Sequence, residues 1–126
     1  MGTLDGMEGD LIRRAGIRFV GIPGGGLHGV ALLNAVRNGW ELTRAIFVAR
    51  RLLREERPAA ILATGGFVSG PVALAARLER VPLMVYVPDV EPARSVKAIA
   101  RLAQRVAVSV EDSLDYFPQG KAVVTG

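Results

Sequence analysis

The stretch Ala59-Ala60-Ile61-Leu62-Ala63-Thr64-Gly65-Gly66-Phe67-Val68-Ser69-Gly70-Pro71 decides the fold, because an apolar run leads directly into paired glycines and then into a helical pattern. The run predicts a buried strand, and a helix is expected to open near Ser69 with Pro71 at or near its first turn. Paired glycines let backbone N–H groups approach a ligand, and a helix N-terminus adds partial positive charge. The junction therefore suits a phosphate or pyrophosphate, although a tight turn with Ser69 as N-cap explains the same residues.

Strand and helix patterns alternate along the rest of the chain. The expected strands are residues 17–22, 59–64, 82–87, 105–109 and 121–125, and the expected helices are residues 30–37, 40–56, 70–78 and 93–102. Asn38-Gly39 is expected to end the first of these helices. Short Val/Ile/Leu-rich runs without alternation are typical of a parallel sheet covered on both faces. The sequence thus predicts one α/β domain over residues 1–126, with a doubly wound, mostly parallel, Rossmann-like sheet.

Composition limits the classes of function. The 126 residues are half hydrophobic, carry a net charge of +4 and include no cysteine. This composition excludes disorder as the main state, as well as disulfides and thiolate metal sites. No apolar run approaches the ~20 residues of a membrane-spanning helix, and the first residues are not a signal peptide, so a cytoplasmic protein is expected. The arginines are dispersed rather than clustered among aromatics, which argues against nucleic-acid binding.

Three loops are expected to meet at one edge of the sheet. In doubly wound sheets, ligands bind beyond the carboxyl ends of the strands, where the strand order reverses. Residues 23–29, 65–69 and 86–92 all follow expected strands. Glycines in the first two loops and prolines in the third favour a ligand cleft lined by backbone over plain turns.

A second candidate surface lies between residues 30 and 53. Positions at helical spacing from Leu42 to Leu53 are expected to face the sheet. The remaining apolar residues lie beside arginines, which is how a peripheral protein binds an anionic membrane. Alternatively, Trp40 and Phe47 complete the core and the arginines form a solvated face. The residues of this predicted membrane patch are Leu32, Leu33, Val36, Arg37, Trp40, Arg44 and Phe47.

The order of the glycine-rich segments resembles that of a known family. Gly25-Gly26-Leu27-His28-Gly29 and Gly65-Gly66-Phe67-Val68-Ser69-Gly70-Pro71 are similar to two segments of MurG-type glycosyltransferases of family 28, which usually have tyrosine where Phe67 stands. The opening residues 2–8 and the closing residues 105–126 resemble the same family in the same order. These enzymes add N-acetylglucosamine to undecaprenyl-pyrophosphoryl muramoyl-pentapeptide in peptidoglycan synthesis. The resemblance implies the acceptor-binding, N-terminal half of a two-domain GT-B enzyme.

The resemblance also implies roles for particular residues. The family's second glycine-rich loop contacts the pyrophosphate of the lipid-linked acceptor, a role that falls here on Thr64, Gly65, Gly66, Phe67, Ser69 and Gly70. The family's membrane patch falls on residues 30–47 and favours peripheral binding at the cytoplasmic face of an anionic membrane. A UDP-sugar would bind only through a donor domain beyond Gly126. The implied reaction is direct displacement, in which a base activates the acceptor hydroxyl and neither a cofactor nor a metal takes part.

Two departures from the family pattern shape the expectations. The family's first strand, its first glycine-rich loop and a candidate catalytic histidine would precede Met1, so a partial domain is expected whose exposed sheet edge is prone to self-association. Without the donor domain, this chain is expected to be inactive alone. Tyr86-Val87-Pro88-Asp89 stands where the family has His-Glu-Gln-Asn. Asp89 is therefore a candidate base or, alternatively, a loop-capping residue. The alternative function is a non-catalytic subunit of a split glycosyltransferase that binds a lipid pyrophosphate.

Overall fold

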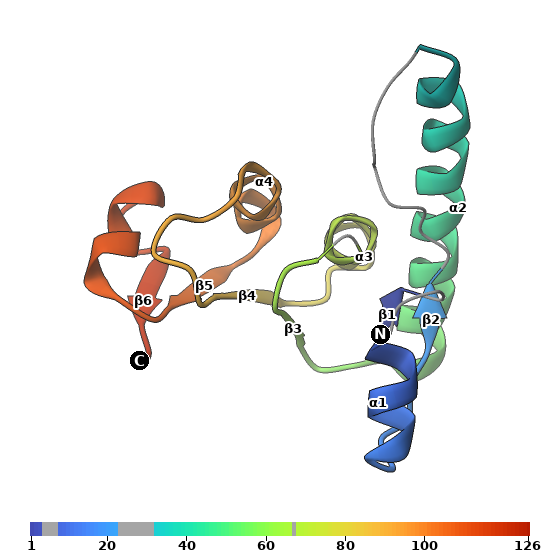
Figure 1. Cartoon of the computed structure of the whole chain (residues 1–126), viewed down its shortest axis with the longest axis horizontal. Helices are drawn as coiled ribbons and strands as arrows, with labels where there is room; N and C mark the ends of the chain where they lie inside the picture. Colours follow the sequence, from blue (N-terminus) through green and yellow to red (C-terminus); the bar gives the residue numbers. More distant parts are fainter. Residues whose placement is uncertain (4–7, 23–31, 67) are drawn as a thin grey trace.

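The computed structural model of the chain describes residues 1–3, 8–22, 32–66 and 68–126 (Figure 1). Its helices are α1 (Glu8–Arg14), α2 (Leu32–Glu56), α3 (Ser69–Glu79) and α4 (Arg94–Leu102), with a 3-10 helix η1 (Glu111–Tyr116). Its strands are β1 (Gly2–Thr3), β2 (Gly21–Ile22), β3 (Ile61–Ala63), β4 (Leu83–Val87), β5 (Arg105–Val108) and β6 (Ala122–Val124). In these residues the strands form two sheets, a β1-β2 pair and a four-stranded sheet in the order β3-β4-β5-β6.

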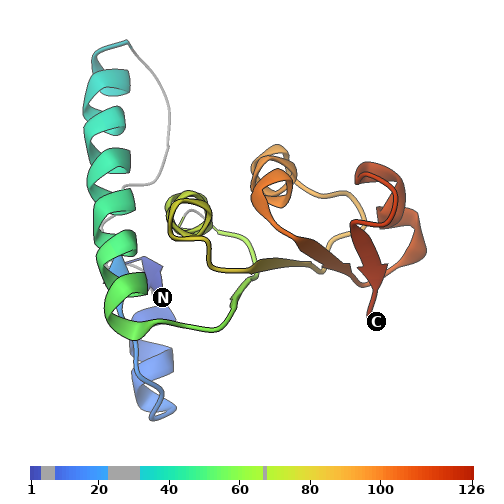
Figure 2. The same ribbon diagram turned by 180° about the vertical axis from the view of Figure 1, so that it is seen from behind.

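Every strand pair in the described residues is parallel, which confirms the predicted α/β fold. Helices α3 and α4 lie side by side on one face of the four-stranded sheet (Figures 1 and 2). Val85, Val106 and Val108 form the fully buried centre of that face. On the opposite face Leu62 and Met84 are exposed, so the core of this sheet lies between the strands and the two helices.

Helix α2 runs without interruption through Asn38-Gly39, so the predicted break there is wrong. A glycine inside a helix costs only about 1 kcal/mol relative to alanine, and a long helix with tertiary contacts tolerates that cost. The Thr43 hydroxyl also donates a hydrogen bond to the Gly39 carbonyl at 2.8 Å. The glycine signal was therefore outweighed by the helix on both sides of it.

The buried side of α2 packs mainly against α3 rather than against the sheet, which corrects the expected orientation. Ala45, Ala49 and Leu53 are buried there, whereas Leu42, expected to face the sheet, is 42% exposed. Small side chains on both helices allow close approach, because Ala73 and four further buried positions of α3 are alanine, valine or proline. Helical periodicity thus correctly predicted that Ala49 and Leu53 are buried, but it did not predict that α3 is the element that covers them.

An acidic residue of α3 ties the two helices together. Both carboxylate oxygens of Glu79 accept charge-assisted hydrogen bonds from α2, one from Arg50 Nε at 2.7 Å and one from Arg54 Nε at 2.9 Å. The hydrogen bonds from Arg54 and Arg50 lower the pKa of Glu79, and the Glu79 partner raises the pKa of Arg54. Charge-assisted pairs of this kind are stronger than neutral hydrogen bonds.

The strand expected at residues 17–22 is shorter in the structure, where β2 includes only Gly21 and Ile22. Helix α1, which the sequence did not predict, ends in a turn in which Gly16 has φ +73° and its N–H bonds to the Arg13 carbonyl at 3.0 Å. The Ile17 N–H then bonds back to the Ile12 carbonyl at 3.1 Å. These bonds hold the chain at the end of α1, so strand pairing begins only at Gly21.

Candidate functional site

The turn between β3 and α3 has the backbone conformation that its glycines predict. Gly65 has φ +95° and Gly66 has φ +83°, a region that residues with a Cβ rarely adopt. Helix α3 begins at Ser69 and holds Pro71 in its first turn, as the sequence predicts. The chain thus leaves the carboxyl end of a parallel strand and presents a helix N-terminus three residues after Gly66.

Ser69 holds this turn together instead of capping the helix. The N-cap position belongs to Val68, which makes no side-chain cap hydrogen bond. The Ser69 hydroxyl donates to the Gly65 carbonyl, and the Ser69 N–H bonds to the Gly66 carbonyl at 3.3 Å. The alternative with Ser69 as N-cap is therefore wrong. With its hydroxyl hydrogen used inside the turn, Ser69 leaves backbone N–H groups and the helix end as the donors for an anion.

A cavity of about 470 Å³ opens beside the glycine turn. Thr64 and Gly66 are exposed, whereas the Ser69 side chain is buried. Gly70, also a predicted pyrophosphate residue, lies one position into α3, and Phe67 lies outside the described residues. Four of the predicted pyrophosphate residues line the cavity together, namely Thr64, Gly65, Gly66 and Ser69.

The cavity wall carries little charge in the part of the chain that the structure describes. Glu56 is the ionisable side chain of its lining, and its carboxylate lies 2.6 Å from Arg18 Nη2. This exposed ion pair offsets the negative charge of Glu56, while the rest of the lining is mostly apolar or backbone. An anion at the glycine turn would therefore depend on backbone donors and on the partial charge at the start of α3.

The loop after β4 is fixed by a residue that the sequence analysis missed. Ser113, in η1, is fully buried, and its hydroxyl lies 3.2 Å from the Asp89 carbonyl and 2.9 Å from the Val90 carbonyl. The Asp89 side chain is exposed, and its carboxylate makes no hydrogen bond to the described residues. The geometry thus gives no support to loop capping by Asp89. A serine in a polar 3-10 segment has no sequence pattern that could have predicted its role.

A second hydrogen bond joins two strand ends at the same edge of the sheet. The Tyr86 hydroxyl of β4 lies 3.0 Å from the hydroxyl of Ser109, which follows β5. Because β4 and β5 are parallel, both groups lie near the carboxyl ends of their strands. Two of the three loops expected at this edge, described except for Phe67, do follow neighbouring strands, whereas residues 23–29 lie outside the described residues.

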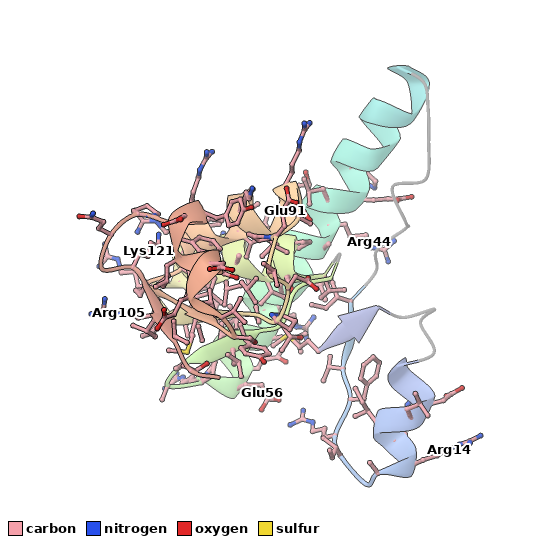
Figure 3. All side chains as sticks on the ribbon, turned by 60° about the vertical axis from the view of Figure 1, so that its left-hand side comes forward. Arg14, Arg44, Glu56, Glu91, Arg105 and Lys121 are labelled. Carbon is pink, nitrogen blue, oxygen red and sulfur yellow. The ribbon has the colours of Figure 1, made fainter. Side chains whose placement is uncertain are left out.

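Helix α2 presents an exposed aromatic and basic face. Trp40 is 72% exposed and Phe47 is 63% exposed, so these two side chains do not complete the core. Arg44 is also exposed, and the spacing i, i+4, i+7 places the three on one side of the helix. Figure 3 shows Arg44 on α2, on the opposite side of the molecule from Arg105 and Lys121. The other predicted patch residues, Leu32, Leu33, Val36 and Arg37, lie in α2 but outside the described side chains.

None of the helices in the described residues is both long enough and apolar enough to cross a membrane. The same residues contain no cluster of three His, Cys, Asp or Glu side chains arranged to hold a metal ion.

Residues 1–108 match the sequence profile of the glycosyltransferase family 28 N-terminal domain. The chain belongs to this family. The matched residues include the glycine turn, the loop after β4 and the exposed face of α2. The match confirms the family that the glycine-rich segments of the sequence resemble.

Relatives of this family 28 chain carry one common description. A protein of Roseiflexus sp. (strain RS-1), 46% identical over 118 residues, is named UDP-N-acetylglucosamine–N-acetylmuramyl-(pentapeptide) pyrophosphoryl-undecaprenol N-acetylglucosamine transferase. A protein of Azotobacter vinelandii with the same name is 37% identical over 126 residues. These alignments cover 93% and 100% of this chain, but 27% and 35% of the two relatives.

The fold is shared with a solved member of the same group. The crystal structure of Acinetobacter baumannii MurG superimposes with a TM-score of 0.78 and 26% sequence identity, covering 98% of this chain and 34% of the other. This similarity confirms the GT-B N-terminal fold that the sequence resemblance implied. The chain spans about a third of the length of the relatives it matches.

Proposed function

We propose that this chain is the acceptor-binding part of an N-acetylglucosaminyltransferase of peptidoglycan synthesis, a hexosyltransferase. Its acceptor would be a lipid-linked pyrophosphoryl-undecaprenol, and its donor UDP-N-acetylglucosamine, bound through a further domain. Relatives of this name that are up to 46% identical support the assignment. The observation that carries it is the glycine turn with two positive φ angles, at the end of a parallel strand and at the start of α3.

The turn supplies donors of the kind that a pyrophosphate needs. Thr64, Gly65, Gly66, Phe67, Ser69 and Gly70 are the residues that we assign to this contact. A helix N-terminus carries about half a positive charge, and each favourable interaction with an anion contributes roughly 0.3–1 kcal/mol. In direct displacement, the acceptor hydroxyl would attack the anomeric carbon while UDP leaves. Asp89, exposed in the loop after β4, is the candidate to accept the hydroxyl proton.

We assign membrane contact to the exposed face of α2. Aromatic side chains partition into the headgroup region, and arginines attract anionic lipids. Trp40, Arg44 and Phe47 combine both kinds of side chain on one side of the helix. This face would bring the acceptor site to the cytoplasmic surface of the membrane as a peripheral attachment.

The test of acceptor binding uses vesicles with and without undecaprenyl pyrophosphate. We expect the purified chain to bind the pyrophosphate-loaded vesicles at least tenfold more tightly, and Gly66→Ala to abolish this increment. The matched control is Gly120→Ala, because Gly120 also has a positive φ (+76°) and open space around it but lies in the turn before β6. Equal loss in both variants, or no pyrophosphate increment in the folded chain, would overturn the acceptor assignment.

The test of membrane contact compares anionic with neutral vesicles. Trp40→Ala and Phe47→Ala should each weaken co-sedimentation with anionic vesicles several-fold. Leu78→Ala is the matched control, because Leu78 is 57% exposed but lies on α3. If the Leu78 variant loses as much binding as the other two, the face of α2 is not the membrane-binding surface.

A further inference from the structure

Another cavity lies on the C-terminal half of α2, apart from the glycine turn. Its volume is about 470 Å³, which falls within the roughly 300–1,000 Å³ range of small-molecule sites. All of its lining residues belong to α2, so one continuous helix builds it. We call this cavity the arginine hollow, and its residues are Phe47, Arg50, Arg51, Arg54 and Glu55.

Two carboxylates hold the three guanidinium groups of the hollow. Arg51 Nε donates a hydrogen bond to Glu55 at 2.7 Å. The Nε atoms of Arg50 and Arg54 donate to Glu79 of α3, at 2.7 Å and 2.9 Å. These bonds use Nε, whereas the two Nη nitrogens of a guanidinium carry four further N–H donors. Three positive charges beside two negative ones leave the hollow with an excess of positive charge.

Arginines held in this way favour a phosphate group as ligand. A guanidinium is planar and binds phosphate oxygens through two parallel N–H bonds. Side chains that are already held in place lose less conformational entropy when a ligand binds. Arg50 is half-buried, and Arg51 and Arg54 are exposed, so a ligand can reach the cluster. Glu55 is the acidic residue of the lining, and its bond to Arg51 offsets its charge.

The hollow continues the exposed aromatic and basic face of α2. Spacings of four, three, four and three residues place five side chains on one side of the helix, namely Trp40, Arg44, Phe47, Arg51 and Arg54. At 1.5 Å per residue this side extends over about 21 Å. The buried residues of α2 pack against α3 on the opposite side, and α2 forms one border of the molecule (Figures 1 and 2). The hollow and Trp40 therefore face the same surface.

Phe47 favours a phosphate that carries a hydrocarbon chain over a free phosphate ion. Its side chain is exposed and forms the apolar part of the lining, next to the arginines. A phospholipid has the same arrangement, because its phosphate lies beside the start of its acyl chains. Aromatic side chains and arginines are also the residues that bind the headgroup region of a membrane.

We propose that the arginine hollow binds the phosphate of one phospholipid headgroup. The guanidinium groups of Arg51 and Arg54 contact the phosphate oxygens, and the start of an acyl chain lies against Phe47. This inference rests on the membrane contact proposed above and assigns to that contact one defined lipid site. Because α2 alone lines the hollow, the site is separate from the glycine turn that we assign to the acceptor.

A soluble lipid tests this site apart from general attraction to a membrane. The probe is dihexanoyl phosphatidic acid, kept below the concentration at which it forms micelles and added to the folded 126-residue chain. We expect the NMR signals of the Nε–H groups of Arg51 and Arg54 to shift and saturate, while the signal of Arg77 on α3 stays unchanged. The absence of a saturating shift at Arg51 and Arg54 would overturn the proposal, even if the chain sediments with anionic vesicles.

Two further ligands identify which part of the lipid is bound. Inorganic phosphate makes no contact with Phe47 and should bind at least tenfold more weakly than the lipid. Equal affinity would show a site for free phosphate and would overturn the lipid assignment. Dihexanoyl glycerol lacks the phosphate and should leave the arginine signals unchanged. If it shifts them as much as the phosphatidic acid does, the hollow does not recognise phosphate and the proposal is wrong.

Charge-neutral variants locate the site on α2. Arg51→Gln and Arg54→Gln should each weaken binding of dihexanoyl phosphatidic acid at least fivefold, measured at the arginine signal that remains. Arg51 is exposed and bonded within its own helix, so its variant should keep the melting temperature within a few degrees. Arg77→Gln makes the same change of charge at an exposed position of α3 and is the matched control. Equal weakening by the Arg77 variant would overturn the proposal.

Discussion

The buried Ser113 hydroxyl lies 2.9 Å from the carbonyl oxygen of Val90. This hydrogen bond joins η1 to the loop after β4, and the same hydroxyl lies 3.2 Å from the Asp89 carbonyl. The backbone path of the candidate base Asp89 is therefore set by a residue 24 positions later in the chain. Ser113 therefore fixes the backbone of the loop that carries Asp89, the base proposed above.

Replacing Ser113 with alanine should therefore loosen the loop after β4. The change leaves two carbonyls without their donor, and we expect a loss of about 1 kcal/mol in the free energy of unfolding, measured in urea. Amide exchange at residues 89–91 should accelerate more than at β5. The control is Ser95→Ala, because Ser95 is exposed on α4 and should change stability by less than about 0.5 kcal/mol. Equal exchange rates at residues 89–91 in the two variants would contradict the positioning role.

Alanine at two glycines should change stability in opposite directions. Gly66 has φ +83° with open space around it, so Gly66→Ala adds only backbone strain and should cost about 1–2 kcal/mol. Gly39 is exposed within α2 and also has open space, so Gly39→Ala should stabilise the chain by roughly 0.5–1 kcal/mol. Thermal unfolding of both variants checks the pair. A destabilised Gly39 variant would mean that α2 does not continue through this position in solution.

Local sequence patterns predicted the elements whose signals lie within a few residues of one another. Val-rich runs identified β4 and β5, and the glycine pair with Pro71 identified the start of α3, because these signals arise from burial and backbone conformation within a few residues. The break at Asn38-Gly39 was wrong, because helix contacts with α3 outweigh the cost of one glycine. For these elements, local propensity therefore predicted the type better than the length.

The candidate site was predictable only where it depends on the backbone. Gly65 and Gly66 are recognisable because a positive φ demands glycine. Ser113 is not, since its importance comes from a contact 23 residues away in sequence that no local pattern records. The exposure of Trp40 follows from the family resemblance, which predicted a membrane patch here; periodicity alone left open whether Trp40 is exposed or completes the core.

Stability should depend on acid through Glu79. Its bonds to Arg54 and Arg50 lower the pKa of its carboxyl group below the usual value of about 4.3. As the pH falls, the Glu79 carboxylate is therefore protonated at a higher pH in the unfolded chain than in the folded chain. The stabilisation is present above about pH 4.3 and is lost as the pH falls through the lower pKa of the folded chain. Unfolding in urea from pH 7 to pH 2.5 measures the effect.

Glu79→Gln is the variant that isolates this pH dependence. The difference in unfolding free energy between the original chain and this variant should be constant above about pH 5 and should shrink below about pH 4. Glu111→Gln, at an exposed carboxylate of η1, is the control and should show a smaller pH-dependent difference. A Glu79 difference that stays constant down to pH 2.5 would show that the Arg50 and Arg54 contacts do not persist in solution.

Arg44 should contribute an electrostatic part to the free energy of binding to anionic membranes. An arginine near an anionic surface contributes about 1 kcal/mol, so Arg44→Gln should weaken binding to anionic vesicles about fivefold at physiological salt. The difference should nearly vanish at 1 M salt, where the screening length is about 3 Å, whereas the loss in Trp40→Ala should persist because it is apolar. Arg77→Gln, at an exposed arginine of α3, is the matched control. Equal weakening by the Arg77 variant would mean that net charge, rather than the face of α2, attracts the chain to the membrane.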